Sequence, residues 1–382
     1  MEQTMIRRFS VTGVGGQGKI EKTFDPEINI FTGRNGSGKT TLMKLIWYLI
    51  SGNIERALQE VPFVSAEVET DKYIISINRR SNNDADIRVS VGQENLHFSP
   101  PSDDDDDFGS PDSYIDEANT VCSKLGTSLF FPTFRRIEGG FSLASTRRGA
   151  VTGRLPRSQS SIEEGLFDLS RRLSNGRHLF IASFSTVDIV DLLMRKYTEL
   201  SEQNNVLQRT VSERIIERIK LHKNEVRTAD AGTSVLPESR QSAEETIDEI
   251  RRQIEQLDAA RLETLAPLEA IKNLVEKLFH HSGIVLNARV SFGDAAHAVN
   301  SDQLSAGEKQ MLSFICYNAF YQNATIFIDE PELSLHVDWQ RQIFPILQRQ
   351  GSSNQFIVAT HSPFIYSKFP EKEIILQEDR GE

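Results

Sequence analysis

The stretch that decides the fold is residues 28–41, with the sequence INIFTGRNGSGKTT. Its residues 33–40 match the pattern G-x-x-x-x-G-K-[ST], in which a glycine-rich loop joins a strand to a helix. A β-like run, INIF, precedes the loop, and the apolar run TLMKLIWYLI at 41–50 follows it, as this context requires. Backbone N–H groups of such a loop surround phosphate oxygens, and the dipole of the helix N-terminus favours negative charge. The sequence therefore predicts a phosphate-binding P-loop.

Two side chains of the loop have defined roles in phosphate chemistry. In P-loops the lysine, here Lys39, reaches the β and γ phosphates, and the hydroxyl of the next residue, here Thr40, binds magnesium. We therefore expect ATP and Mg2+ as cofactors. The residues expected to bind ATP lie in the loop or directly after it: Gly33, Asn35, Gly36, Ser37, Gly38, Lys39, Thr40 and Thr41.

A pair of carboxylates follows a second apolar strand far along the chain. The run IFI at 326–328 ends in Asp329 and Glu330. A buried strand of a parallel sheet places such residues at its carboxyl edge, beside the P-loop. We expect Asp329 to bind the magnesium ion together with Thr40, and Glu330 to orient or deprotonate the attacking water. An exposed acidic turn before Pro331 is the structural alternative.

Residues 304–310, LSAGEKQ, precede a predicted helix. Ser305 is placed to cap this helix, and Glu308 three residues later completes the pattern of a capping box. Capping alone would explain both residues. Two further short motifs follow the carboxylates: LSLH at 333–336 and ATHS at 359–362. The second contains His361, which alone would be read as a structural histidine after a strand.

In their order along the chain, these motifs resemble the P-loop, signature, Walker B, D-loop and switch histidine of the ABC-type ATPases. The resemblance implies an α/β fold: an ABC-type P-loop ATPase head with an antiparallel β subdomain and an inserted antiparallel helical arm. It also implies ATP hydrolysis with Glu330 and His361 as catalytic residues. In that family the signature faces the γ-phosphate bound by another subunit, so Ser305, Gly307 and Glu308 would act in trans. Self-association as a head-to-head dimer or a higher even oligomer would follow.

Composition limits the class of protein. The chain has 382 residues, of which 38% are hydrophobic and 25% charged, as in ordinary globular proteins. The formal net charge is -11, so overall charge does not drive binding to nucleic acid. Two separated cysteines fit a reducing compartment, and no apolar run reaches the roughly 18 residues of a membrane span. We expect a soluble cytoplasmic protein with no membrane contact.

β-like segments dominate the first part of the chain. Residues 5–12 and 19–24 alternate like the strands of a hairpin, and three later runs suggest an antiparallel meander. These runs are 66–68, 73–78 and 87–91. Residues 13–18 match G-x-G-x-x-G, but they lead into a strand, so a hairpin turn is favoured over a dinucleotide site.

Helical spacing of apolar residues predicts two long helices, at 187–222 and 242–279. A polar stretch separates them, so an antiparallel pair is the simplest arrangement. We expect residues 1–165 and 284–382 to form the two halves of the ATPase head, and residues 166–283 to form the helical arm.

Within the ABC-type ATPases, the chain resembles the overcoming-lysogenization-defect (OLD) group, which includes the Septu and retron-associated ATPases. The blocks that carry this resemblance are GRNGSGKTTLMKLIW, FFPTFRRIE, LSAGEKQ and IFIDEPELSLH. It implies a regulatory or sensing role in bacterial anti-phage (antiviral) defence. Many members continue into a Toprim nuclease, whereas this chain ends 21 residues after His361. We therefore expect a separate effector, an HNH or Toprim nuclease, with a reverse transcriptase and its nucleic acid as a further candidate partner.

Two other functions are weighed against defence. Transport is disfavoured because 266 residues separate Lys39 from Ser305, far more than in transporter ATPases. A DNA-repair or chromosome-maintenance ATPase of the RecF and SMC type shares the head and arm architecture and is the alternative. Neighbouring genes would discriminate, since nuclease or reverse-transcriptase genes support defence and replication genes support repair.

Three stretches are weaker candidates. Residues 130–136, FFPTFRR, fall where the ABC family carries a glutamine loop (Q-loop), but they contain no glutamine. Residues 99–113 are rich in Pro, Ser and Asp, which predicts a mobile insertion. Four arginines without a neighbouring acid could contact DNA, RNA or an acidic partner, although a solvated loop is the alternative. They are Arg147, Arg148, Arg154 and Arg157.

Overall fold

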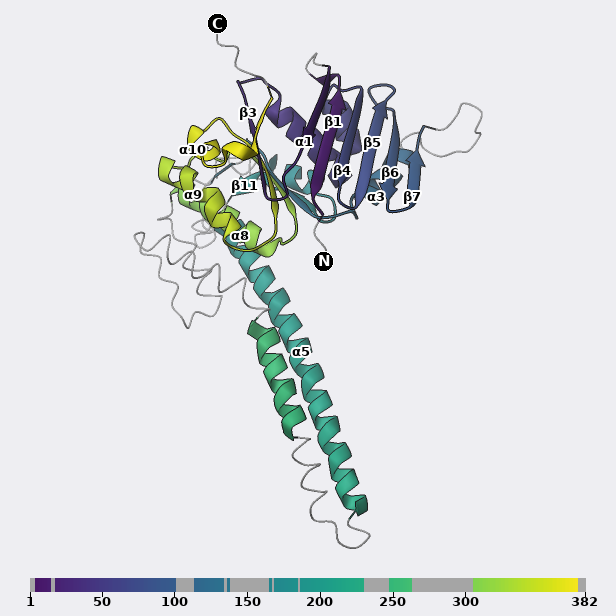
Figure 1. Cartoon of the computed structure of the whole chain (residues 1–382), viewed down its shortest axis with the longest axis vertical. Coiled ribbons are helices and arrows are strands. Elements are labelled where there is room, and N and C mark those ends of the chain that lie inside the picture. Colours follow the sequence, from purple (N-terminus) through teal and green to yellow (C-terminus); the bar gives the residue numbers. More distant parts are fainter. Residues whose placement is uncertain are drawn as a thin grey trace, which may run out of the picture. The chain divides into compact units, whose positions relative to one another are not determined.

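The computed structural model describes residues 4–14, 18–100, 113–133, 136–137, 165–166, 168–184, 186–229, 247–262 and 305–376. The chain divides into two compact units. The first consists of Met1–Thr186 with Asp302–Glu382, and the second is Val187–Ser301. The division into three segments expected from the sequence stays a prediction. Figure 1 shows the elements in both units.

A parallel sheet forms the centre of the first unit. Its described strands are β3 (Ile28–Thr32), β8 (Ser128–Phe131), β10 (His178–Phe180), β12 (Thr325–Asp329), β13 (Gln355–Ala359) and β14 (Glu373–Ile375). They stand in the order β10-β8-β12-β13-β3-β14, and neighbours run parallel. Strands β3, β8, β12 and β13 are buried along their whole length, which explains their largely apolar sequences. One strand, β13, therefore separates the strand that leads into the P-loop from the strand that ends in Asp329.

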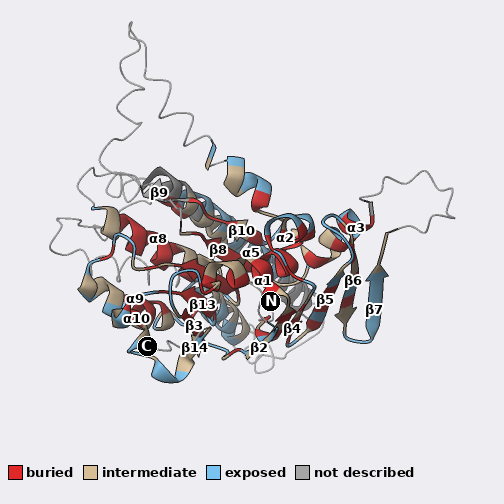
Figure 2. Ribbon diagram, turned by 90° about the horizontal axis from the view of Figure 1, so that it is seen from above, coloured by how far each residue is buried: buried red, intermediate tan, exposed pale blue. Residues whose placement is uncertain are grey.

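A second, antiparallel sheet contains the predicted hairpin and meander. Its strands are β1 (Ile6–Thr12), β2 (Lys19–Thr23), β4 (Ser65–Thr70), β5 (Tyr73–Arg79), β6 (Ala85–Val91) and β7 (Glu94–Phe98). They stand in the order β2-β1-β4-β5-β6-β7, and neighbours run antiparallel. Burial alternates along β4 and β5, so one face is packed and the other exposed. Figure 2 shows the outermost strand, β7, as largely exposed.

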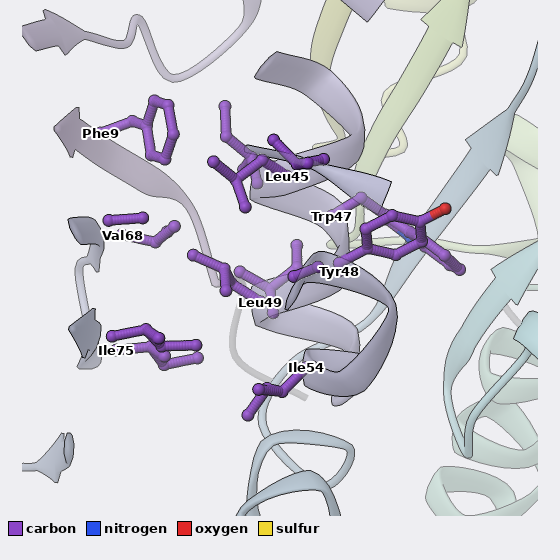
Figure 3. Close-up of a cluster of buried hydrophobic side chains, with 14 of the residues drawn as sticks. Phe9, Leu45, Trp47, Tyr48, Leu49, Ile54, Val68 and Ile75 are labelled. Atoms are coloured by element: carbon purple, nitrogen blue, oxygen red, sulfur yellow. The ribbon is translucent and has the colours of Figure 1, made fainter. Parts of the chain in front are cut away.

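Helix α1 (Lys39–Ser51) carries the apolar run after the P-loop into the core. Leu45 and Leu49 point toward Phe9 and its neighbours on the antiparallel sheet (Figure 3). On the other side, the ring centroid of Trp47 lies 5.4 Å from that of Phe130 in the parallel sheet. Because both sheets pack against it, α1 is buried on nearly all sides and its sequence lacks a polar face. The P-loop is therefore anchored to a rigid element.

Several shorter elements complete the first unit. They are α2 (Ile54–Glu60), α3 (Ser113–Cys122), β9 (Arg136–Ile137), β11 (Ser183–Phe184), α8 (Ala306–Phe320), α9 (Val337–Gln348), α10 (Pro363–Tyr366) and a 3-10 helix at Pro370–Lys372. Helix α8 begins where the sequence predicts a capped helix, and α9 follows the LSLH motif.

The second unit is helical in its described part. Helix α5 (Thr186–Ala229) has 44 residues and includes the first long helix predicted from the sequence. Residues 247–262, within the second predicted helix, are also helical. The inserted antiparallel arm as a whole stays a prediction, because most of its remaining residues lie outside the described ranges. No helix in the described part of the chain is both long and apolar enough to cross a membrane.

Candidate nucleotide-binding site

The loop between β3 and α1 has the backbone that a P-loop needs. Gly33, Gly36 and Gly38 have φ values of 139°, 81° and 89°, a region that side chains with a Cβ rarely adopt. A Cβ at Gly36 or Gly38 would meet no atom within 4 Å, so backbone conformation rather than crowding requires glycine there. Asn35 is exposed on this loop, whereas Thr41 is half-buried on α1. All the expected ATP-binding residues lie in this loop or in the first turn of α1.

Lys39 lies folded back into the loop. Its Nζ donates hydrogen bonds to the carbonyl oxygens of Gly33 at 2.9 Å and Arg34 at 3.1 Å, and it lies 3.5 Å from the Ser37 Oγ. The residue is 6% exposed. Burial lowers the pKa of Lys39, and the nearby carboxylates, including Asp329, oppose this shift. A poorly solvated ammonium within a glycine-rich loop is arranged to bind phosphate oxygens.

Asp329 meets Thr40 at the edge of the parallel sheet, although 289 residues separate them in sequence. The Thr40 hydroxyl lies 3.0 Å from Oδ1 and 2.9 Å from Oδ2 of Asp329. The aspartate is 1% exposed, at the end of the fully buried strand β12. A hydroxyl and a carboxylate are the hard oxygen ligands that magnesium prefers. The donor set therefore fits the expected ion.

The remaining magnesium ligands would have to come from phosphate and water. Among the described residues, no group of three or more His, Cys, Asp or Glu side chains could hold a metal ion by itself. Magnesium in nucleotide sites typically keeps several waters and uses one or two carboxylates together with substrate phosphates. The single buried carboxylate beside the P-loop matches this pattern.

Thr133 is a site residue that the sequence reasoning missed. Its hydroxyl donates a hydrogen bond to Oδ2 of Asp329, the same oxygen that lies next to Thr40. The residue follows β8, the strand that pairs with β12. The Q-loop pattern requires a glutamine, so it gives no signal for a threonine hydroxyl at this strand end. Thr133 is thus placed beside the expected metal position.

We predict that Thr133→Ala weakens ATP binding in the presence of magnesium by about tenfold, because groups that orient a metal-binding carboxylate typically contribute 10–100-fold to metal affinity. Thr133→Ser, which keeps the hydroxyl, should bind like wild type. Equilibrium ATP binding measured with magnesium and with EDTA separates a role at the metal ion from a role in supporting the loop. An equal loss in EDTA would show that Thr133 supports the loop rather than the ion.

Glu330 has the environment of a catalytic base. Its backbone is left-handed, with φ 49°, and its N–H donates to the Ala359 carbonyl at 2.8 Å. Burial raises the pKa of the Glu330 carboxyl, and the charges of Asp329 and Glu332 raise it further, whereas His361 and Lys39 lower it. A carboxylate with a raised pKa is a stronger proton acceptor. The unusual backbone conformation at a non-glycine residue is typical of functional sites.

His361 lies on the turn after β13 and is exposed. Its backbone N–H donates to Oε1 of Glu332 at 2.7 Å, and the Thr360 hydroxyl donates to Oε2 at 2.8 Å. Strands β12 and β13 are parallel neighbours with Asp329 opposite Ala359, so the two predicted catalytic residues follow adjacent strand ends at one edge of the sheet. Glu332 is a second site residue that the sequence did not predict, because its place in the run PELSLH at 331–336 carries no signal for this contact.

The predicted capping box at the start of α8 is confirmed. The Glu308 N–H donates to the Ser305 Oγ at 3.3 Å, and the Ser305 N–H donates to Oε2 of Glu308 at 2.8 Å. Both side chains therefore have a role within their own chain, and their action in trans stays a proposal.

Gly307 has a packing role that the sequence did not reveal. A Cβ at this position would lie 2.5 Å from the carbonyl oxygen of Ser334, so the N-terminal turn of α8 approaches the LSLH motif closely. Gln310, one turn later, donates from Nε2 to the Pro331 carbonyl at 2.9 Å. A larger residue at position 307 would therefore disturb its own chain before it reached any partner.

Three groups of weaker candidates lie wholly or mostly outside the described residues. They comprise residues 134–135 of the FFPTFRR run, most of the acidic stretch at 99–113, and the four arginines Arg147, Arg148, Arg154 and Arg157. Their expected roles stay predictions.

Two family models match the sequence. The model described as "AAA domain" covers residues 13–261. The model described as "AAA domain, putative AbiEii toxin, Type IV TA system" covers residues 235–367. The first match extends over well more than half of the chain, and the second reaches from the helical unit past the carboxylates to His361.

One relative and two solved structures show more distant similarity. The "Retron Ec83 probable ATPase" of Escherichia coli is 34% identical over 87 residues, covering 19% of this chain and only 16% of that protein. The Smc head domain bound to the C-terminal domain of ScpA from Pyrococcus furiosus has 16% identity, a TM-score of 0.37, and coverage of 95% and 91% of the two chains. The SmcHead bound to the C-winged helix domain of ScpA has 14% identity, a TM-score of 0.38 and the same coverage.

The family matches span the P-loop and the buried carboxylate Asp329 beside it. The chain belongs to the AAA-domain family of ATPases.

Proposed function

We propose that this chain binds and hydrolyses ATP with magnesium at the carboxyl edge of its parallel sheet. The observation that carries the proposal is the contact between the Thr40 hydroxyl and both oxygens of Asp329, at 3.0 and 2.9 Å. This contact joins the phosphate loop to a buried carboxylate that is suited to the metal. ATP turnover measured with magnesium and with EDTA tests the proposal, and equal rates in both would contradict it.

The residues of the pocket divide the chemistry between them. The loop N–H groups and Lys39 bind the phosphates, and Thr40 and Asp329 would hold the magnesium ion, which when bound would supply charge neutralisation at the transferred phosphoryl group. Glu330 accepts the proton of the attacking water at its carboxylate. His361, on the neighbouring turn, contacts the γ-phosphate from the same chain. Positioning and electrostatic stabilisation supply most of the rate in such reactions.

The pocket is completed by a second copy of the chain. In this proposal, Ser305, Gly307 and Glu308 of one protomer face the γ-phosphate held by its partner, so the active form is a head-to-head dimer or a higher even oligomer. Ser305 is exposed at the start of α8, which leaves it accessible to a partner. Gly307 is unsuitable as a probe because of its contact with Ser334.

Mixing two inactive variants tests this arrangement. We predict that Ser305→Arg and Lys39→Ala are each inactive, and that an equimolar mixture recovers about a quarter of the wild-type rate if pockets act independently, because each heterodimer contains one intact pocket. Gln322→Arg, an exposed change beyond the other end of α8, is the control and should be fully active. Heterodimers without any recovered activity would contradict a signature that acts in trans on an independent pocket.

We further propose that the chain is an OLD-type ATPase subunit that senses infection or regulates a separate effector in bacterial anti-phage defence. The short match to the Retron Ec83 protein favours this function over a RecF or SMC type of repair ATPase. The effector would be an HNH or Toprim nuclease, with a reverse transcriptase and its nucleic acid as further partners. Arg147, Arg148, Arg154 and Arg157 are the proposed contacts with DNA or RNA, and the cytoplasm is the proposed location.

Purification of the chain together with its adjacent gene products tests the biological role. Under the defence proposal, a nuclease should copurify, its activity should depend on the nucleotide state of the ATPase, and the genes together should protect a host from phage. Wild-type phage sensitivity together with a replication or repair defect on deletion would instead support the alternative.

A further inference from the structure

We propose that Glu332 is a positioning residue for His361, and that its carboxylate fixes the turn that carries the imidazole to the γ-phosphate. This inference rests on the proposed function, because it assigns a mechanism to the same pocket. The sequence motifs assign no role to Glu332.

Both oxygens of the Glu332 carboxylate are used by the turn after β13. Oε1 accepts the His361 N–H at 2.7 Å, and Oε2 accepts the Thr360 hydroxyl at 2.8 Å. The Thr360 Oγ1 in turn accepts the Ser362 N–H at 2.9 Å. One side chain therefore constrains three consecutive residues centred on His361. Hydrogen bonds to a charged carboxylate are roughly twice as strong as neutral ones.

Glu332 is itself held close to the catalytic carboxylates. It lies two residues after Glu330 in the segment after β12, and the preceding carbonyl, of Pro331, accepts from the buried Gln310 amide at 2.9 Å. Strands β12 and β13 are neighbours, with Asp329 opposite Ala359. The Glu332 carboxylate thus connects the segment after β12, which carries the predicted base Glu330, to the turn after β13, which carries His361.

Gln340 of α9 makes a second, neutral bridge between the same two segments. Its Oε1 accepts the Ser362 hydroxyl at 2.6 Å, and its Nε2 donates to the Leu335 carbonyl at 2.8 Å. This bridge ends at Ser362, one residue beyond His361, so it supports the turn without touching the histidine backbone. Loss of Glu332 should therefore misplace the part of the turn that carries His361, while Gln340 still holds Ser362 and the overall fold.

The chemistry of the side chain predicts which substitutions are tolerated. Glu332→Ala removes both acceptors and leaves the His361 N–H and the Thr360 hydroxyl without their carboxylate. Glu332→Gln keeps an oxygen for the His361 N–H, and its amide can donate to the Thr360 Oγ1, which has a free lone pair. If positioning is the role, the glutamine variant should retain much of the function that the alanine variant loses.

A double-mutant cycle on ATP turnover provides the kinetic test. Glu332→Ala should lower kcat about 10- to 100-fold with little change in KM, since small misplacement of a catalytic group can cost about 100-fold. In a His361→Ala background, the same change should lower kcat much less, because only the effect of the Glu332 charge on Glu330 remains. Glu60→Ala is the matched control, because Glu60 also accepts a hydroxyl, from Tyr48 at 2.7 Å, away from the pocket. Multiplicative loss in the double variant, or a wild-type kcat for Glu332→Ala, would overturn the proposal.

The NMR signal of the His361 imidazole distinguishes failure of the positioning role from failure of the proposed function. With 13C-labelled histidine, His361 can be identified among the eight histidines by the signal missing in His361→Ala. Glu332→Ala should shift or broaden that signal in the folded protein, whereas Glu332→Gln and Glu60→Ala should leave it near its wild-type position. An unchanged signal in Glu332→Ala overturns the positioning role whatever the activity. Full turnover by His361→Ala would overturn the proposed function of the histidine instead.

Discussion

Replacing Lys39 with alanine should abolish measurable ATP binding. The ammonium is the one positive side chain folded into the described P-loop, where it contacts the Gly33 and Arg34 carbonyls and is almost fully buried. Charge-assisted hydrogen bonds contribute about 1.5–3 kcal/mol each, so losing the contacts to two phosphates should weaken binding at least about 100-fold. Isothermal titration with ATP and magnesium measures the effect directly.

Lys44→Ala is the matched control for this prediction. Lys44 lies about one turn after Lys39 on the same helix, and its Nζ lies 4.0 Å from the Glu60 carboxylate on α2. The control should bind ATP like wild type. Thermal unfolding of both variants is needed because Lys39 also satisfies loop carbonyls, and a folded Lys39→Ala protein with wild-type affinity would disprove the assignment of the loop.

Features set by neighbouring residues could be predicted from the sequence. The P-loop, the buried strand before Asp329 and the Ser305 cap each depend on local patterns: glycine spacing, an unbroken apolar run, and a Ser with Glu three residues later. The hairpin at the start of the chain follows from alternation and a glycine-rich turn, and the structure pairs Val11 with Ile20. Local physical constraints were sufficient for these elements.

Features set by strand order could not be predicted in the same way. Thr133 reaches Asp329 because β8 pairs with β12, and Glu332 reaches His361 because β12 pairs with β13. Nothing in the local sequence of either residue encodes which strands are neighbours. The same holds for Gly307, whose need for glycine comes from the carbonyl of Ser334 on another element. In each case a long-range contact, rather than a propensity, assigns the role.

Replacing Glu330 with glutamine should lower ATP turnover about 100- to 10,000-fold, the usual contribution of a general base, while ATP binding stays intact. The amide keeps the size of the side chain but cannot accept the proton of the attacking water. The residue already holds a left-handed backbone, and its N–H bond to Ala359 does not involve the side chain, so the local fold should survive. Single-turnover hydrolysis and equilibrium binding, measured on the same preparation, separate the two effects.

If two protomers enclose the nucleotide, the Glu330→Gln protein should also accumulate as a closed dimer, because ATP stabilises that state by mass action and is no longer consumed. Light scattering with and without ATP measures this shift. Glu27→Gln is the control, since Glu27 directly precedes β3 at the amino end of the same sheet, and its carboxylate accepts a hydrogen bond from Gln348 at 3.2 Å. Undiminished turnover would move the base to another residue. Lost turnover without dimers would keep Glu330 as the base and contradict the enclosed pocket, so this variant tests the chemistry and the assembly separately.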